Sequence, residues 1–263
     1  MTAIRLSHIS KVFPVLDDAD DAENNANGAG GGGLFRALDD VCLDIEQGTC
    51  TVISGANGSG KSLLMAIIAG LENQSAGERE VRGKVGLVFQ DADSQILGET
   101  PREDVAVGVR LPPFAGKKAA APIVEKALSE TGLLHRADFP SRFLSGGEKR
   151  RLAVAGVLAM NVETIIFDEP YANLDYGGVV QTNTVIKELR ARNKTLVILT
   201  HELEKCLAFA ENFAVLFKGK IVFCGTPEEG LRHPLEQWSI RHPLRPATRS
   251  HAPCASIEDL CWL

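Results

Sequence analysis

Short uninterrupted apolar runs recur along the chain and predict strands that are buried on both faces. They are rich in Val, Ile, Leu and Phe and stop at polar or glycine residues, which is typical of the inner strands of a parallel sheet. These runs cover residues 50–54, 85–89, 164–167 and 195–199. Residues 4–13 predict an opening strand, and residues 41–45 alternate as a half-exposed strand would. Residues 213–217 and 221–224 flank a Lys-Gly-Lys turn and predict a hairpin.

Helical patterns fill most of the intervals between these strands. Residues 62–71 are apolar almost all round, which predicts a buried helix. Residues 145–160 open with capping-box spacing and predict a second helix, and residues 179–192 predict a third. The stretch 91–137 is mixed but mainly helical, with a break at residues 111–113. Strands that alternate with helices predict an α/β fold around a largely parallel sheet.

An acidic and glycine-rich insertion follows the opening strand. Residues 17–33 contain almost no apolar side chain, so they cannot bury enough surface to offset the entropy lost on ordering. We predict a disordered hairpin tip at about residues 16–33. A phosphate-binding role for these glycines is disfavoured, because no strand directly precedes them and no helix follows.

The composition is that of an ordinary globular protein, with 263 residues of which 44% are hydrophobic. This length fits one large domain or two small ones. The formal net charge of −6 includes no broad basic excess, so we expect no nucleic-acid partner. The chain starts without an apolar signal region, and its longest apolar helical run, residues 63–69, is too short to span a bilayer. We expect a soluble protein that reaches a membrane only through a partner.

The 6 cysteines are scattered singly along the chain, and none forms a Cys-x-x-Cys pair. A chain of this size does not need a disulfide scaffold, so we expect free thiols in a reducing cytosol. His251, Cys254 and Cys261 are potential metal ligands near the C-terminus. Structural zinc sites usually have paired, closely spaced ligands, so we expect no metal site there.

A phosphate-binding loop lies between the apolar strand at 50–54 and the helix at 62–71. Its glycines allow a tight turn that points backbone N–H groups at phosphate oxygens, and the start of the helix adds its positive end. Lys61 supplies a charge for the outer phosphates, and the Ser62 hydroxyl is placed for Mg²⁺. The residues expected to contact a nucleotide here are Gly55, Asn57, Gly58, Ser59, Gly60, Lys61, Ser62 and Leu63.

Two further motifs carry polar groups at the ends of elements. Asp168 and Glu169 end an apolar strand, and ligands of open α/β sheets bind at the carboxyl ends of strands. An ordinary solvated strand end is the plain alternative. Residues 145–147 offer backbone donors at a helix start, which is a second anion site. A capping role for Ser145 is compatible with that site.

Three motifs, taken in their order along the chain, resemble those of ATP-binding cassette (ABC) ATPases. They are residues 55–62, the signature Leu144-Ser145-Gly146-Gly147-Glu148 and residues 164–170. The resemblance extends over roughly residues 3–225. It implies an α/β ABC-type nucleotide-binding domain with a RecA-like core, a peripheral antiparallel β subdomain and a helical signature subdomain at about 91–160. The ATPase domain would then cover residues 1–225, and residues 226–263 would be a C-terminal extension.

The resemblance also implies roles for single residues. Asp168, with Ser62, would order Mg²⁺, and Glu169 would polarise the water that attacks ATP. Gln90 would contact Mg²⁺ and the water as a sensor of the γ-phosphate, and His201 would be the switch histidine. A lone Gln or His is usually structural, and it is their order along the chain that favours these roles.

Other residues would bind nucleotide at the base and across a dimer. Phe13 lies where the family often has an aromatic that stacks on adenine. Leu63 replaces a Thr that many members carry and so removes one hydroxyl contact. The family binds ATP between the phosphate loop of one subunit and the signature of a second, packed head to tail, and the second ATPase subunit would be either a copy of this chain or a paralogue. That arrangement would recruit Ser145, Gly146, Gly147, Glu148 and Asp175.

Residues 86–95, 103–108 and 149–160 resemble one branch of the family, the ATPases of energy-coupling-factor importers and of cobalt or nickel uptake systems. This implies uptake of a vitamin or a transition-metal ion through a separate integral membrane protein. The chain would then sit peripherally on the cytoplasmic face of the cell membrane. Two departures stand out, the acidic-glycine insertion and a short 77–85 segment, which predicts a reduced peripheral sheet.

Two alternatives stay open. One is an ABC ATPase of another transporter branch. The other is a non-transport ABC ATPase acting in DNA repair or on the ribosome. Chromosome-type members carry a long coiled coil between phosphate loop and signature, and ribosome-type members carry two cassettes in one chain. This sequence has neither feature.

Overall fold

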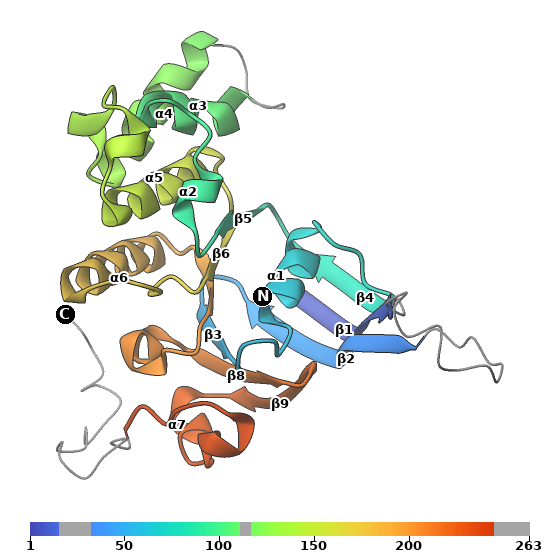
Figure 1. Cartoon of the computed structure of the whole chain (residues 1–263). Coiled ribbons are helices and arrows are strands. Elements are labelled where there is room, and N and C mark those ends of the chain that lie inside the picture. Colours follow the sequence, from blue (N-terminus) through green and yellow to red (C-terminus); the bar gives the residue numbers. More distant parts are fainter. Residues whose placement is uncertain (16–32, 111–116, 245–263) are drawn as a thin grey trace, which may run out of the picture.

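The computed structural model describes residues 1–15, 33–110 and 117–244 (Figure 1). Several predictions therefore fall outside the described residues. These are the disorder of the insertion apart from Gly33, the break at 111–113, and the C-terminal residues His251, Cys254 and Cys261. Within the described part of the chain, no helix is both long and apolar enough to cross a membrane.

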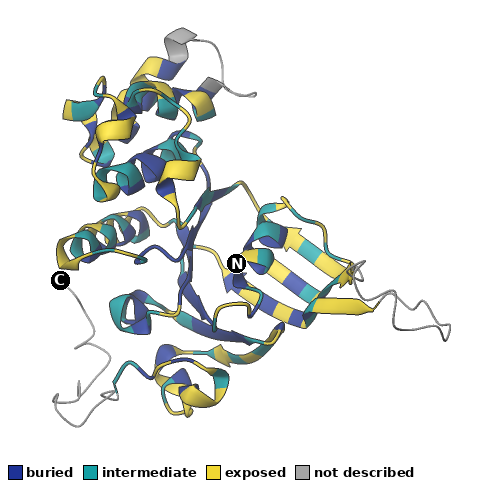
Figure 2. Cartoon of the chain, viewed as in Figure 1, coloured by how far each residue is buried: buried dark blue, intermediate teal, exposed yellow. Residues whose placement is uncertain are grey.

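A six-stranded sheet forms the centre of the fold. Its strands pair in parallel except for the edge hairpin of β8 (Asn212–Phe217) with β9 (Lys220–Gly225), as the sequence predicts. Every residue of the inner strands β3 (Cys50–Ser54), β6 (Thr164–Asp168) and β7 (Thr195–Leu199) is buried, which explains their uninterrupted apolar runs (Figure 2). The spatial order is β5 (Val85–Val88), β6 (Thr164–Asp168), β7 (Thr195–Leu199), β3 (Cys50–Ser54), β8 (Asn212–Phe217) and β9 (Lys220–Gly225).

Each face of this sheet is covered by a different layer. Neighbouring residues of β7 point to opposite faces, so Val197 belongs to one hydrophobic cluster and Ile198 to the other. Helix α1 (Lys61–Ala69) and the peripheral sheet cover the Val197 side. Helices α5 (Gly146–Ala159) and α6 (Tyr176–Ala191) cover the Ile198 side.

The peripheral sheet is antiparallel and has the order β2 (Leu34–Glu46), β1 (Thr2–Pro14) and β4 (Ala76–Val81). Strands β1 and β2 form a hairpin around the insertion, and the Val15 N–H donates to the Gly33 carbonyl at 2.7 Å. The short 77–85 segment nevertheless supplies β4, an edge strand that the sequence pattern missed. Its residues are mostly polar and exposed, so they lack the apolar pattern of the inner strands.

The region from 91 to 160 is helical, as predicted, and has a hydrophobic cluster of its own. It stands away from the peripheral sheet in Figure 1. Helix α5 contributes to this cluster and to the cluster on the Ile198 side of the sheet. The elements besides α5 are α2 (Ala92–Gln95), α3 (Pro101–Arg110), α4 (Lys117–Glu130), η2 (Leu134–Arg136) and η3 (Ser141–Phe143).

The described part of the predicted C-terminal extension packs on the sheet. Leu235 and Ile240 are buried in the same cluster as Ile198, and the Trp238 ring stacks on Phe223 of β9 with centroids 6.5 Å apart. A domain boundary at residue 225 stays a prediction. The remaining short elements are η4 (Leu203–Lys205), η5 (Leu207–Phe209), α7 (Pro227–Gly230) and η6 (Leu235–Trp238).

Candidate functional site

The phosphate-binding loop joins β3 to α1 at the carboxyl edge of the sheet. Gly58 and Gly60 have φ of +77° and +106°, a backbone region that side chains disfavour. A Cβ on Gly55 would lie 2.3 Å from the Leu216 carbonyl oxygen, so that position also requires glycine. The sequence-based reason for these three glycines is therefore supported by the geometry.

The start of α1 leaves backbone donors available. The first hydrogen bond of the helical pattern runs from the Leu64 N–H to the Gly60 carbonyl, at 2.8 Å. The N–H groups of residues 61–63 come before this bond and have no carbonyl acceptor within the helix. No side chain caps this helix, and its first turn has no acidic residue. The Leu63 side chain packs on the hydrophobic cluster, so its backbone is the group that faces an anion.

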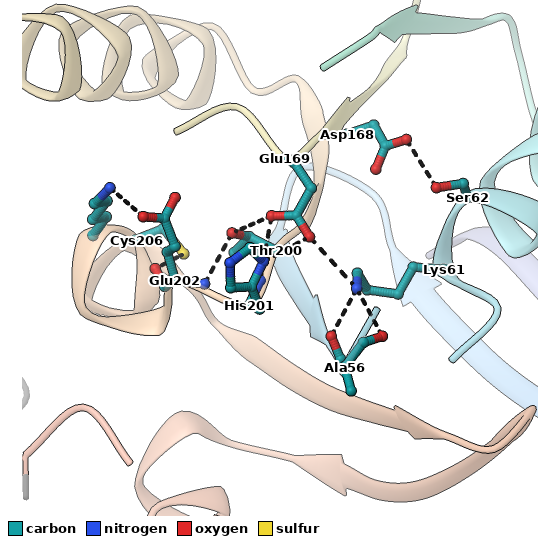
Figure 3. Close-up of polar contacts among 11 residues, drawn as sticks. Ala56, Lys61, Ser62, Asp168, Glu169, Thr200, His201, Glu202 and Cys206 are labelled. Atoms are coloured by element: carbon teal, nitrogen blue, oxygen red, sulfur yellow. Dashed lines mark hydrogen bonds and ion pairs between the residues drawn. The ribbon is translucent and has the colours of Figure 1, made fainter. Parts of the chain in front are cut away.

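Lys61 folds back over the loop. Its Nζ donates to the carbonyl oxygens of Gly55 at 2.7 Å and Ala56 at 3.3 Å (Figure 3). The same Nζ lies 3.5 Å from Glu169 Oε1, and the lysine is 7% exposed. The carbonyl oxygens hydrogen-bond the buried ammonium, and the Glu169 carboxylate supplies the opposite charge. A phosphate group that entered the loop would offer the ammonium a stronger partner than the two carbonyls.

Ser62 and Asp168 meet across the site. The Ser62 hydroxyl donates to Asp168 Oδ2 at 3.1 Å. Burial raises the pKa of Asp168, and the hydrogen bond from Ser62 opposes that rise. A hydroxyl and a carboxylate are hard oxygen ligands of the kind that Mg²⁺ prefers. The residues present therefore fit a magnesium ion at this position.

Glu169 is held by several donors at once. Its Oε1 lies 3.1 Å from His201 Nδ1, and its Oε2 accepts from the Thr200 hydroxyl at 3.0 Å and the His201 N–H at 3.4 Å (Figure 3). Its φ of +45° is unusual for a residue other than glycine. The backbone hydrogen bond from Glu169 N–H to the Leu199 carbonyl, at 2.8 Å, fixes that conformation. The predicted catalytic carboxylate and switch histidine are thus in direct contact.

Thr200 is a site residue that the sequence analysis missed. Its side chain is fully buried, and its Oγ1 also accepts the Glu202 N–H at 3.1 Å. The hydroxyl therefore orients Glu169 and is itself oriented by the next loop. Only the pairing of β6 with β7 brings Thr200 to Glu169, and a sequence does not reveal which strands are neighbours.

Gln90 follows β5, the strand next to β6, and so lies at the same edge of the sheet. Its carbonyl accepts from Arg150 Nη2 at 3.2 Å, which ties it to α5. Gln95 has a supporting role that the sequence does not predict. Its side-chain amide accepts from the Phe89 N–H at 3.0 Å and donates to the Leu87 carbonyl at 2.9 Å, so it holds the segment that carries Gln90.

The signature residues form the predicted capping box. Ser145 Oγ accepts the Glu148 N–H at 3.3 Å, and Glu148 Oε2 accepts the Ser145 N–H at 2.8 Å. The hydrogen bond from the Ser145 backbone N–H is the main cause of the lowered pKa of Glu148. A Cβ on Gly146 would meet nothing within 4 Å, so the helix start faces open space. Asp175 caps α6 by accepting the Gly178 N–H at 2.8 Å.

Among the described residues, no hydrogen bond or ion pair joins residues 145–148 or Asp175 to the phosphate loop. The structure therefore brings Lys61, Ser62, Asp168, Glu169 and His201 together at one site. The signature and Asp175 make their own capping contacts elsewhere.

Phe13 lies near the end of β1, on the insertion side of the β1–β2 hairpin. It pairs across the strands with Phe35, and Lys11 Nζ is 5.1 Å from the centre of its ring. The two aromatic residues are 37% and 59% exposed, so both can meet a planar ligand. Phe35 was missed because the insertion hides its alignment with Phe13.

The comparisons with known proteins agree on one family. The profile of the ABC transporter family matches residues 38–172. The chain is 37% identical over 230 residues to the cobalt import ATP-binding protein CbiO of Rhodobacter capsulatus, with 81% of each chain covered. It is also 37% identical over 223 residues to the energy-coupling factor transporter ATP-binding protein EcfA of Carboxydothermus hydrogenoformans, covering 80% of this chain and 82% of that one.

A solved structure gives the same result for the fold. CbiO1 from Clostridium perfringens, part of the ABC transporter complex CbiONQ, superimposes with a TM-score of 0.72 at 27% identity. The match covers 88% of this chain and 91% of that chain. The sequence-based prediction of the fold class is thereby confirmed.

Proposed function

Because the chain belongs to the ABC transporter family and is one of its ATPases, we propose that it powers uptake of a vitamin or transition-metal ion through a separate membrane component. Its relatives are ATP-binding subunits of cobalt and energy-coupling-factor transporters. The observation that carries the catalytic part is the meeting of Lys61, Ser62, Asp168, Glu169 and His201 at one edge of the sheet.

We assign the residues as follows. The N–H groups of residues 61–63 and the Lys61 ammonium bind the outer phosphates of ATP, with Lys61 leaving its carbonyl partners. Ser62 and Asp168 hold Mg²⁺, with Gln90 at the same edge, and the ion when bound neutralises phosphate charge. Glu169 accepts a proton from water as the water oxygen bonds to the γ-phosphorus. The bond from that phosphorus to the leaving ADP oxygen then breaks.

His201 and Thr200 have a positioning role in this scheme. Both hydrogen-bond the Glu169 carboxylate, so they set its direction toward the attacking water. Phe13 and Phe35 offer ring faces for the adenine base. The remaining half of the site comes from a second ATPase subunit, which supplies Ser145–Glu148 and Asp175. This is supported by the open space at Gly146, at the start of α5, and by the absence of any hydrogen bond between residues 145–148 and the phosphate loop among the described residues.

A hollow beside the site suits a membrane partner. One part, of about 350 Å³, is lined by Gln90, Asp91 and Asp93 together with residues 172–174. An adjoining part, of about 460 Å³, is lined by Asp93, by Glu99 and other residues of the loop before α3, and by residues 140–142. Leu97 is 76% exposed in the loop between α2 and α3. We propose that a cytoplasmic segment of the integral membrane protein docks here and holds the chain at the cytoplasmic face of the membrane.

The contacts of the acidic residues show which charge reversal would test the docking site. Asp91 caps α2 by accepting the Asp93 N–H at 3.0 Å, so a change there also disturbs the helix. Glu99 is exposed and lines the hollow. Glu99→Lys is therefore the cleaner variant, and Glu78→Lys on the exposed face of β4 is its matched control.

The experiment is purification of the tagged chain from membranes, with identification of bound integral proteins, beside an ATPase assay on the isolated subunit. Glu99→Lys should lose the membrane partner and keep ATPase activity, and Glu78→Lys should keep both. Equal partner binding by the two variants would remove the hollow as the docking site. Active ATPase without any integral membrane partner for the unaltered chain would refute the transport role.

A further inference from the structure

Four register shifts interrupt the pairing of β1 with β2 on the peripheral sheet, and two of them lie on either side of the pair Ile9–Val41. Between the pairs Leu6–Leu43 and Ile9–Val41, β1 carries one extra residue. On the other side of Ile9–Val41, β2 carries the extra residue instead. Bulges redirect side chains and are common beside functional sites. Back-to-back bulges on opposite strands turn side chains of both strands toward one spot.

His8 lies in the first bulge and Asp40 in the second. Each has a φ of +56°, a left-handed conformation that is uncommon outside glycine. The Asp40 N–H donates to Ser10 Oγ at 3.0 Å, which holds the second bulge in place. His, Asp and Asn are the residues other than glycine that adopt this conformation most readily, and here His8 and Asp40 place metal-binding side chains at both bulges.

These bulges bring together three side chains that bind metals. His8 Nδ1 lies 2.7 Å from Asp40 Oδ1 and 3.8 Å from Cys42 Sγ. One ligand atom from each residue lies within 4.8 Å of the other two. The His8 N–H also donates to Cys42 Sγ at 3.3 Å, which fixes the sulfur opposite the first bulge.

The separations suit a shared ion. At the usual zinc bond lengths, neighbouring ligand atoms of a tetrahedral site are about 3.3–3.6 Å apart. A small rotation of the His8 ring away from Asp40 and toward Cys42 would bring both of its separations into that range. The ligand atoms of Asp40 and Cys42, within 4.8 Å of each other, would close on the ion by side-chain rotation. The side chains of His8 and Asp40 are 76% and 66% exposed, so an ion can enter from solvent and keep water as its fourth ligand.

We propose that His8, Asp40 and Cys42 form a surface site for one divalent transition-metal ion, such as Zn²⁺ or Co²⁺. A thiolate with an imidazole and a carboxylate is a donor set for such ions, whereas Mg²⁺ takes oxygen ligands. The site is separate from Ser62 and Asp168, and it does not depend on the transport role. A bound ion would join β1 to β2 in the hairpin that carries Phe13 and Phe35.

The test titrates Co²⁺ into the intact nucleotide-free protein and records absorption. Thiolate bound to Co²⁺ gives a charge-transfer band, and the oxygen ligands at Ser62 and Asp168 do not. We expect this band to saturate at one ion per chain and to persist in excess Mg²⁺. Zn²⁺ should displace the Co²⁺, in line with the usual order of affinities.

Variants assign the band to residues. Cys42→Ser should abolish it. His8→Asn and Asp40→Asn keep a residue that tolerates the left-handed backbone, and each should weaken affinity at least about tenfold, since even losing an outer partner of a ligand costs that much. Cys224→Ser, at another exposed thiol, and the double variant Cys254→Ser with Cys261→Ser should leave the band unchanged. ATPase activity of each variant reports that it is folded.

Two results would overturn the proposal. One is the absence of a thiolate band in the unaltered protein. The other is a band that survives Cys42→Ser or disappears with the C-terminal cysteines.

Discussion

Thr200→Val tests whether the buried hydroxyl directs Glu169. Valine keeps the shape of threonine, so the substitution removes the hydroxyl with little change in packing. The protein loses the 3.0 Å bond to the Glu169 carboxylate and leaves the Glu202 N–H without its 3.1 Å acceptor. The first loss bears on catalysis, and the second bears on stability.

A hydrogen bond to a charged group contributes about 1.5–3 kcal/mol. If all of this free energy stabilises the transition state through the orientation of Glu169, its loss lowers kcat by about 10- to 150-fold, since about 1.4 kcal/mol is a factor of ten. Within the described part of the chain, the Thr200 hydroxyl bonds to Glu169 and Glu202 and makes no hydrogen bond to the phosphate loop. KM for ATP should therefore stay close to that of the parent protein.

The matched control is Thr195→Val at the opposite end of β7. Thr195 is buried too, and its hydroxyl accepts the Gly48 N–H at 3.0 Å, far along the strand from Glu169. Steady-state ATPase kinetics and thermal unfolding are measured for both variants. Both should unfold at lower temperature, and only Thr200→Val should lose kcat. Unchanged kcat in Thr200→Val, or equal losses in the two, would refute an orienting role.

Three further predictions concern the same site. Glu169→Gln should bind ATP but hydrolyse it about 10²–10⁴-fold more slowly, with an ATP-bound dimer accumulating on size-exclusion chromatography; near-normal turnover would exclude Glu169 as the base. Burial raises the pKa of Asp168, so the folded state loses stability as pH rises through that pKa. Asp168→Asn should therefore melt higher at neutral pH without Mg²⁺ and ATP, with the gain shrinking as pH falls toward the ordinary carboxyl pKa; a lower melting temperature would contradict this. Gly60→Ala should lower the free energy of unfolding, measured with denaturant, by about 1–3 kcal/mol, because its Cβ would lie 2.8 Å from Leu38. Gly58→Ala should lower it less, because its Cβ would meet nothing within 4 Å, and equal losses would disprove the packing argument.

The sequence predicts the inner strands and the phosphate loop because both have strong local signals. A strand buried on both faces must be apolar throughout, as residues 164–167 and 195–199 are. Gly58 and Gly60 take backbone conformations that few other residues adopt. The capping box at Ser145 is likewise a pattern of near neighbours.

What the sequence does not reveal depends on strand order and on exposed edges. Strand β4 is polar because it lies at an edge, so it lacks an apolar run. Thr200 reaches Glu169 only because β7 lies beside β6, and Gln95 returns to β5 through a loop. The cluster of His8, Asp40 and Cys42 depends on two bulges that no local pattern marks.

Helix α5 belongs to two hydrophobic clusters, and this bears on how the molecule unfolds. Leu152 and Ala155 pack among the helices of residues 91–160, while Val154 and Val157 pack on the central sheet. Neither cluster can open without exposing a face of the same helix. The two regions should therefore melt as one cooperative unit, with the amide protons of α5 among the slowest to exchange. The signature at its start is thereby anchored to the most persistent part of the chain.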